Sequence, residues 1–115
     1  MPSANTFRIQ QADSLNYMDL TATRVLTVTE LRTFGAFRVN TTGGAVQLTL
    51  PAAGTGLQGI WYFMNIGTSN LTVICADGGF GGSSAVGDDT MTLTRGDLGV
   101  VVCDGVDFSA NPVVA

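Results

Sequence analysis

Residues 42–79 read TGGAVQLTLPAAGTGLQGIWYFMNIGTSNLTVICADGG, and this stretch contains short apolar runs separated by glycine-rich or polar segments. The runs are Ala45–Leu50, Ile60–Ile66 and Leu71–Cys75, and they are rich in the β-branched and aromatic residues that favour strands. Pro51 ends the first run, and the small residues after it are typical of a loop. The stretch therefore predicts successive β-strands joined by turns and loops.

The same pattern continues on both sides of this stretch and predicts an all-β chain. Further strands are expected at Thr6–Gln10, Arg24–Thr29, Phe34–Asn40, Thr90–Thr94, Leu98–Cys103 and Val106–Ser109. Their spacing is typical of an antiparallel β-sandwich or a jelly-roll-like domain. Only Asp13–Asp19 is predicted to form a helical turn, with Leu15 and Met18 on one side. We therefore expect an extended N-terminal arm over residues 1–14 and one β-sandwich domain over residues 15–115.

The composition excludes much of enzyme chemistry. Histidine is absent and all five basic residues are arginines, so the chain lacks imidazole and lysine amino groups. Catalytic triads, Schiff bases and phosphate-binding P-loops need those groups. Cys75 and Cys103 have no C-x-x-C spacing, which argues against zinc, and we expect them to be buried, reduced thiols. The sequence thus predicts that the protein is not an enzyme and has no catalytic, cofactor-binding or metal-binding residues.

The chain has little charge for its apolar content. Charged residues are 12% of the sequence, against about 25% in ordinary soluble proteins, and the mean hydropathy is +0.32. The longest apolar stretches, Gly59–Ile66 and Leu98–Cys103, are much shorter than the roughly 20 residues that cross a bilayer. The net charge of −4 argues against a nucleic-acid partner. We therefore expect the excess apolar surface to contact protein, not membrane or nucleic acid.

The run Ile60–Ile66 is apolar on both sides of the strand that it predicts. Alternation places Ile60, Tyr62 and Met64 on one side, and Trp61 and Phe63 on the other. Two interpretations remain open: a central strand covered by both layers of a sandwich, or a strand with one side in a subunit interface. On the second interpretation the candidate interface residues are Trp61, Phe63, Tyr62 and Met64, in a homo-oligomer.

A wider pattern emerges when MTLTRGDLGVVVCDGVDFS, residues 91–109, is added to residues 42–79. A strand ending in LP is followed by a glycine-rich loop, a strand ending in N-x-G-T, another strand and a second glycine-rich loop. A strand, a G-D turn and a final strand ending in DG complete the pattern. It resembles the small β-sandwich domains of bacteriophage virion structural proteins, most of all head decoration (cement) proteins. The chain departs from the pattern at Val106-Asp107-Phe108, where an aromatic residue usually follows the turn directly.

This resemblance implies a capsid decoration protein that binds the outside of the phage head as a homotrimer and stabilises it. The implied partners are further copies of the chain and the major capsid protein, and the implied location is the capsid surface of the virion after synthesis in the bacterial host cytoplasm. A tail, fibre or baseplate protein is the first alternative, and a carbohydrate-binding module is the second.

The predicted arm offers a means of docking to the capsid. In a strand over Thr6–Gln10, Phe7 and Ile9 lie on one side and Arg8 lies on the other. Such a strand can add to the edge of a partner's sheet through main-chain hydrogen bonds and two apolar anchors. We therefore identify Phe7, Arg8 and Ile9 as candidate capsid-docking residues, with pairing inside the chain's own sheet as the alternative.

Overall fold

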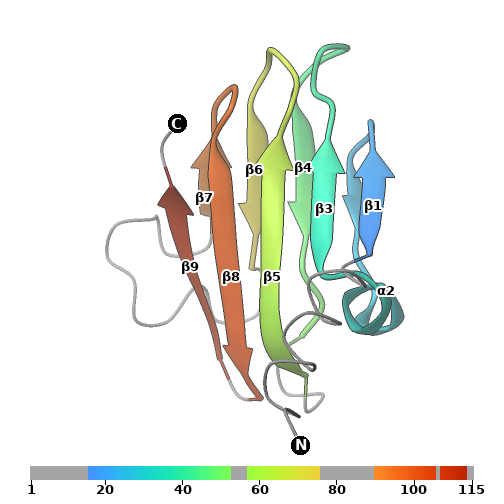
Figure 1. Cartoon of the computed structure of the whole chain (residues 1–115), viewed down its shortest axis with the longest axis vertical. Helices are drawn as coiled ribbons and strands as arrows, with labels where there is room; N and C mark the ends of the chain where they lie inside the picture. The colour runs from blue at the N-terminus through green and yellow to red at the C-terminus, as the bar shows by residue number, and fades with distance from the viewer. Residues whose placement is uncertain (1–15, 53–56, 76–89, 106, 114–115) are drawn as a thin grey trace, which may run out of the picture.

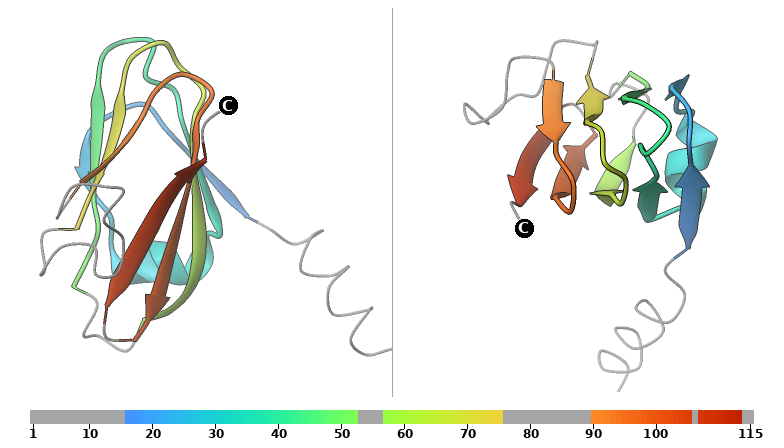
Figure 2. Two further views of the ribbon diagram at one scale, coloured as in Figure 1. Left: turned by 90° about the vertical axis from the view of Figure 1, so that its left-hand side faces the viewer. Right: turned by 90° about the horizontal axis from the view of Figure 1, so that it is seen from above.

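The computed structural model describes residues 16–52, 57–75, 90–105 and 107–113, which form two β-sheets that lie face to face (Figures 1 and 2). In spatial order the five-stranded sheet contains β1 (Tyr17–Leu20), β3 (Ala36–Val39), β5 (Gln58–Asn65), β8 (Leu98–Asp104) and β9 (Phe108–Val113). The four-stranded sheet contains β2 (Arg24–Val25), β4 (Val46–Thr49), β6 (Leu71–Ile74) and β7 (Thr90–Leu93). The short helix α2 (Val28–Thr33) lies at one end of the space between the sheets (Figure 2).

The chain passes back and forth between the sheets. From β1 to β6, odd-numbered strands enter the five-stranded sheet and even-numbered strands enter the four-stranded sheet. Successive strands of the same sheet therefore run in the same direction. As a result β1, β3 and β5 pair in parallel, and so do β2, β4 and β6. After β6 the direction reverses, and β7, β8 and β9 pair antiparallel to β6, β5 and β8. Both sheets are mixed, and the prediction of antiparallel strands holds only for the C-terminal part of the described chain.

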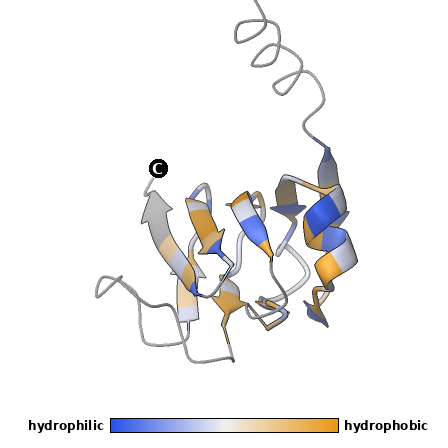
Figure 3. Cartoon of the chain, turned by 90° about the horizontal axis from the view of Figure 1, so that it is seen from below, coloured by the Kyte–Doolittle hydropathy of each residue, from blue (hydrophilic) through white to orange (hydrophobic). Residues whose placement is uncertain are grey.

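The core forms where the inner faces of the sheets meet. Apolar and polar residues alternate along several strands (Figure 3), and the inward side chains of both sheets belong to one buried cluster. Phe37 of β3 and Phe63 of β5 stack near its middle, with ring centroids 5.0 Å apart and planes 12° from parallel. Leu48 and Val73 of the four-stranded sheet are fully buried in the same cluster. Burial of side chains of this size stabilises the fold by about 1.5–3 kcal/mol each.

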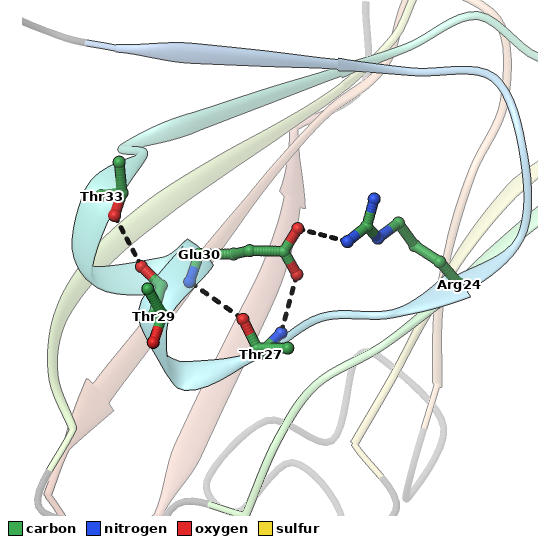
Figure 4. A network of polar contacts seen from close by, with 5 residues as sticks. All are labelled: Arg24, Thr27, Thr29, Glu30 and Thr33. Atoms are coloured by element: carbon green, nitrogen blue, oxygen red, sulfur yellow. Dashed lines mark hydrogen bonds and ion pairs between the residues drawn. The ribbon is translucent and has the colours of Figure 1, made fainter.

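Helix α2 occupies part of the predicted strand Arg24–Thr29, and its start is stabilised by a capping box (Figure 4). The Glu30 backbone N–H donates to Thr27 Oγ1 over 3.1 Å, and the Thr27 backbone N–H donates to Glu30 Oε1 over 2.9 Å. Arg24 forms an ion pair with Glu30, and Leu31 is buried in the core. The threonine and valine content suggested a strand, but the T-x-x-E spacing of a capping box was present in the sequence.

The beginning of the described chain also differs from the prediction. Tyr17–Asp19 belongs to strand β1 and not to a helical turn, because its backbone pairs with β3 over the whole strand. A partner brought alongside by the fold outweighs a weak local preference for helix. The predicted strand Thr6–Gln10, and with it the arm over residues 1–14, lies outside the described residues.

Replacing Thr27 with alanine is expected to lower the free energy of unfolding by about 1 kcal/mol, because one N-terminal N–H of α2 loses its acceptor. The shift is measured from urea unfolding curves. Thr29→Ala is the matched control, since Thr29 is an exposed residue inside the same helix and the substitution keeps the backbone carbonyl that accepts from the Thr33 hydroxyl. An equal effect of both substitutions would contradict the capping role.

Candidate functional site

The outer side of the five-stranded sheet carries a cluster of apolar side chains on its two central strands. Ile60, Tyr62 and Met64 of β5 point away from the core, because the residues between them belong to the core or are buried on the inner side. In the antiparallel register they lie opposite Val102, Val100 and Leu98 of β8. We call these six residues, in three cross-strand rows, the outer apolar face: Ile60, Tyr62, Met64, Leu98, Val100 and Val102.

This face is accessible to solvent. The side chains with the largest exposure are Ile60 at 55%, Val102 at 40% and Tyr62 at 37%, and the other three are partly exposed. Several adjacent exposed apolar side chains on rigid strands form a patch, whereas isolated ones are common on any surface. Such a patch is typical of a protein–protein contact.

The apolar surface extends toward β1 along the middle row. The parallel register places Ala36 between Tyr17 and Tyr62. Ala36 is almost fully buried although it does not belong to the core cluster, and Tyr17 is exposed. The row therefore runs from Tyr17 across Ala36 and Tyr62 to Val100.

Polar groups lie at the ends of the face. Arg38 of β3 binds the Asp19 carboxylate of β1 with Nε–Oδ1 and Nη2–Oδ2 distances of 2.8 and 3.1 Å, and its guanidinium lies 5.1 Å from the centre of the Tyr17 ring. The hydrogen bond to Asp19, and then the charge of that carboxylate, raise the pKa of Arg38 above its usual value. At the opposite end Gln58 Nε2 donates to the Asp104 carbonyl over 3.2 Å. A polar rim around an apolar centre is the usual organisation of a protein interface.

The outer side of the four-stranded sheet has a different composition. One row contains Gln47, Thr72 and Thr92, and the next contains Thr49, Ile74 and Thr90, which extends to the exposed Val25 at the β2 edge. Hydroxyl and amide groups therefore predominate on this side, and no row is wholly apolar. Among the described residues, the wholly apolar cross-strand rows of the two outer sides therefore lie on the five-stranded sheet.

The structure divides the candidate interface residues into two groups. Trp61 and Phe63 are 4% and 0% exposed and lie in the chain's own core, and Trp61 Nε1 donates to the Leu31 carbonyl over 2.6 Å. Tyr62 and Met64 lie on the outer apolar face. The two interpretations of this strand therefore apply to different sides of it: the inner side is covered by the four-stranded sheet, and the outer side is available for a partner.

Four members of the face were not among the candidate residues: Ile60, Leu98, Val100 and Val102. Alternation within Leu98–Cys103 separates Val100 and Val102 from the inward Val101 and Cys103, so their common side could have been recognised. Their position beside Tyr62 could not, because it depends on the pairing of β5 with β8. The candidate docking residues Phe7, Arg8 and Ile9 lie outside the described residues.

The N-x-G-T motif at residues 65–68 builds a buried polar network. Asn65 Nδ2 donates to the carbonyls of Ser69 and Leu93 over 2.7 and 2.9 Å, and Asn65 Oδ1 accepts from the Gly67 backbone N–H over 3.1 Å. The Thr41 hydroxyl lies 2.8 Å from Asn65 Oδ1 and accepts from the Ser69 backbone N–H. A Cβ atom at Gly67 would lie 2.1 Å from the Thr41 backbone nitrogen, so only glycine fits there. The motif therefore joins strand ends and has a structural role.

No group of three or more histidine, cysteine, aspartate or glutamate side chains is placed to hold a metal ion in the part of the chain that the structure describes. Cys75 and Cys103 are thiols and are buried in the apolar core. No helix among these residues is long and apolar enough to cross a membrane.

Comparison of the chain with protein-family models, with curated proteins and with solved structures gives no match. The function must therefore be argued from the residues and their geometry.

Proposed function

We propose that the chain is a structural protein of a bacteriophage particle, without enzymatic activity, that decorates the outside of the head and stabilises it. The observation that carries the proposal is the outer apolar face, an accessible apolar centre with polar groups at its ends, whereas hydroxyl groups predominate on the outer side of the four-stranded sheet. A surface of this kind favours association with protein. The resemblance of residues 42–109 to phage decoration domains directs that association to a virion.

Decoration requires both self-association and attachment to the shell. We assign self-association, as a homotrimer, to copies of this chain, and attachment to the major capsid protein. The two facing sheets with one core support the β-sandwich that such proteins contain. The proposed attachment element is the N-terminal arm with Phe7, Arg8 and Ile9, which can add a strand to a capsid sheet.

The proposed mechanism is thermodynamic. A protein that binds only the intact shell stabilises it by mass action, because each bound copy must dissociate before the shell opens. An oligomer increases this effect, since attachment of one subunit raises the effective concentration of the others near their sites. No reacting group is needed, in agreement with a chain that lacks histidine and lysine.

The alternatives differ in measurable ways. A tail, fibre or baseplate protein occurs in far fewer copies than a capsid lattice has sites. A carbohydrate-binding module stacks sugars on an exposed aromatic ring beside polar loops, but Trp61 is buried under α2 and donates its N–H to a backbone carbonyl. Tyr62 is exposed but lies among aliphatic side chains in the middle of a strand. These features favour a structural protein over a sugar-binding one.

Quantitative mass spectrometry of purified virions tests the proposal. A decoration protein is expected on the order of hundreds of copies per particle, as the symmetry of a shell requires, whereas a tail component is expected in a few to a few tens. In parallel, the full chain should co-sediment with expanded, undecorated heads. Absence from the virion would reject the proposal, and a low copy number would favour the tail.

The same co-sedimentation assay separates the arm from the rest of the chain. A variant without residues 1–14 is expected to remain folded and to lose binding to heads, and Phe7→Ala with Ile9→Ala should weaken binding in the full chain. Normal binding by both variants would place attachment elsewhere.

A further inference from the structure

The outer apolar face is electrically neutral at its centre although the chain has a net charge of −4. Its rows, Ile60 with Val102, Tyr62 with Val100 and Met64 with Leu98, contain no charged side chain. At the β3 end the charge of Arg38 is matched by Asp19. A strongly acidic or basic partner would find no opposite charge at this centre. Copies of this acidic chain can meet there without bringing like charges together.

The sheet is also large enough for a stable contact between copies. Strands lie about 4.8 Å apart and residues advance by about 3.3 Å, so five strands of 4, 4, 8, 7 and 6 residues cover roughly 460 Å². Two such surfaces in contact bury about 900 Å² before the relief of the side chains is counted. Specific protein interfaces begin at about 1,000 Å², a size that this contact reaches once the relief of the side chains is added.

From these observations we infer that the outer apolar face binds the same face of other copies of this chain, so that identical sheets pack against one another in a homo-oligomer. The inference rests on the proposed structural function and identifies the partner of this surface. In the proposed trimer the three outer apolar faces turn toward the threefold axis, so each sheet contacts the sheets of both neighbours. The central strands β5 and β8 then lie nearest the axis, and their side chains fill the space between the three sheets.

Within this contact Tyr62 is the central anchor. It lies between Ile60 and Met64 along β5 and opposite Val100 of β8, so aliphatic side chains surround its ring. Aromatic residues at the centre of an interface, screened from water by such neighbours, contribute most of the binding free energy. The polar groups of Arg38, Asp19 and Gln58 lie around this centre and complete a hydrated rim.

The test variants each introduce a negative charge at the centre of the outer apolar face. The control variant introduces the same charge on the outer side of the four-stranded sheet. The variants are Tyr62→Glu and Ile60→Glu, and the control is Thr92→Glu, at an exposed position on the outer side of the four-stranded sheet. Native mass spectrometry and sedimentation velocity of the full chain measure the oligomeric state across micromolar concentrations. Fluorescence of Trp61, the one tryptophan of the chain, monitors the fold, because its indole is buried in the core of each subunit.

The wild type and Thr92→Glu are expected to form the same oligomer. Tyr62→Glu and Ile60→Glu are expected to be folded monomers, with a dissociation constant at least about 100-fold higher, because like charges would be buried without a counter-charge. Ile60→Glu keeps the test valid where Tyr62→Glu fails to fold, because Ile60 is the more exposed of the two side chains. A monomeric wild type, or Glu variants as oligomeric as the control, would overturn the inference.

The virion measurement distinguishes failure of this inference from failure of the proposed function. A monomer that is abundant on the head would mean that the capsid shell covers the face, so the inference fails and the function stands. If the wild type is an oligomer, the Glu variants dissociate and the protein is absent from the virion, the inference stands and the proposed function fails.

Discussion

Replacing Asn65 with alanine is expected to lower the free energy of unfolding by about 3–5 kcal/mol, as judged by urea unfolding. The side chain donates to the carbonyls of Ser69 and Leu93 and accepts from the Gly67 backbone N–H, and it is 1% exposed. Alanine removes these partners and leaves buried backbone groups without hydrogen bonds. Each such group costs about 1–3 kcal/mol. The loss of unfolding free energy should therefore be larger than the loss caused by removing one methylene group from a typical core side chain.

Asn70→Ala is the control for this experiment, since it removes the same side chain from an exposed position five residues later in the chain. Its effect should stay within about 0.5 kcal/mol, as for most surface substitutions. Asn65→Asp keeps the acceptor but removes the amide donor, and it should be nearly as destabilising as alanine. A mild effect of both Asn65 substitutions would show that water replaces the network.

Replacing Trp61 with alanine is expected to destabilise the folded chain by about 3–5 kcal/mol, because a large buried ring is removed from the core. The substitution also removes the donor to the Leu31 carbonyl of α2. Thermal and urea unfolding measure the loss. This change in stability should not depend on protein concentration, because the contacts of Trp61 lie within a single chain.

Tyr62→Ala is the matched comparison, since the neighbouring residue on the same strand points to the opposite side of the sheet. It should change the stability of a single folded chain by about 1 kcal/mol or less. Under the proposed packing of outer apolar faces, its effect should grow with protein concentration, because Tyr62 then contacts other copies of the chain. Equal and concentration-independent losses for both variants would place Tyr62 in the fold and not in an interface.

Most strands could be located from the sequence because their signals are local. The predicted Ile60–Ile66 and Leu98–Cys103 correspond to β5 and β8 within a residue or two at each end. Alternation also separated Tyr62 and Met64 from Trp61 and Phe63, and these pairs lie on opposite sides of the sheet. The prediction did not include helix α2, although its T-x-x-E capping signal is also local, because the threonine and valine residues of this segment favour a strand.

Strand pairing could not be predicted in the same way. The sequence predicts turns between successive strands, but β3 and β4 belong to different sheets, and the turn at Thr42-Gly43-Gly44 carries the chain from one sheet to the other. The residues of a turn do not determine whether the next strand pairs with the preceding strand in the same sheet or enters the facing sheet. The outcome depends on which arrangement buries the apolar inner faces of both sheets. In this chain that arrangement pairs β1 with β3, and β3 with β5, in parallel.

The sequence by itself determined where most strands lie, that β5 is apolar on both sides, and that chemistry based on histidine or lysine is absent, because composition and alternation are properties of neighbouring residues. Only the tertiary structure decided which side of β5 is covered and which residues join Tyr62 on the other. The four-stranded sheet covers Trp61 and Phe63, while β8 brings Val100 and Val102 beside Tyr62 from about 40 residues further along the chain. The physical reason is that a surface patch depends on contacts between distant segments, and these form only when the chain buries its core.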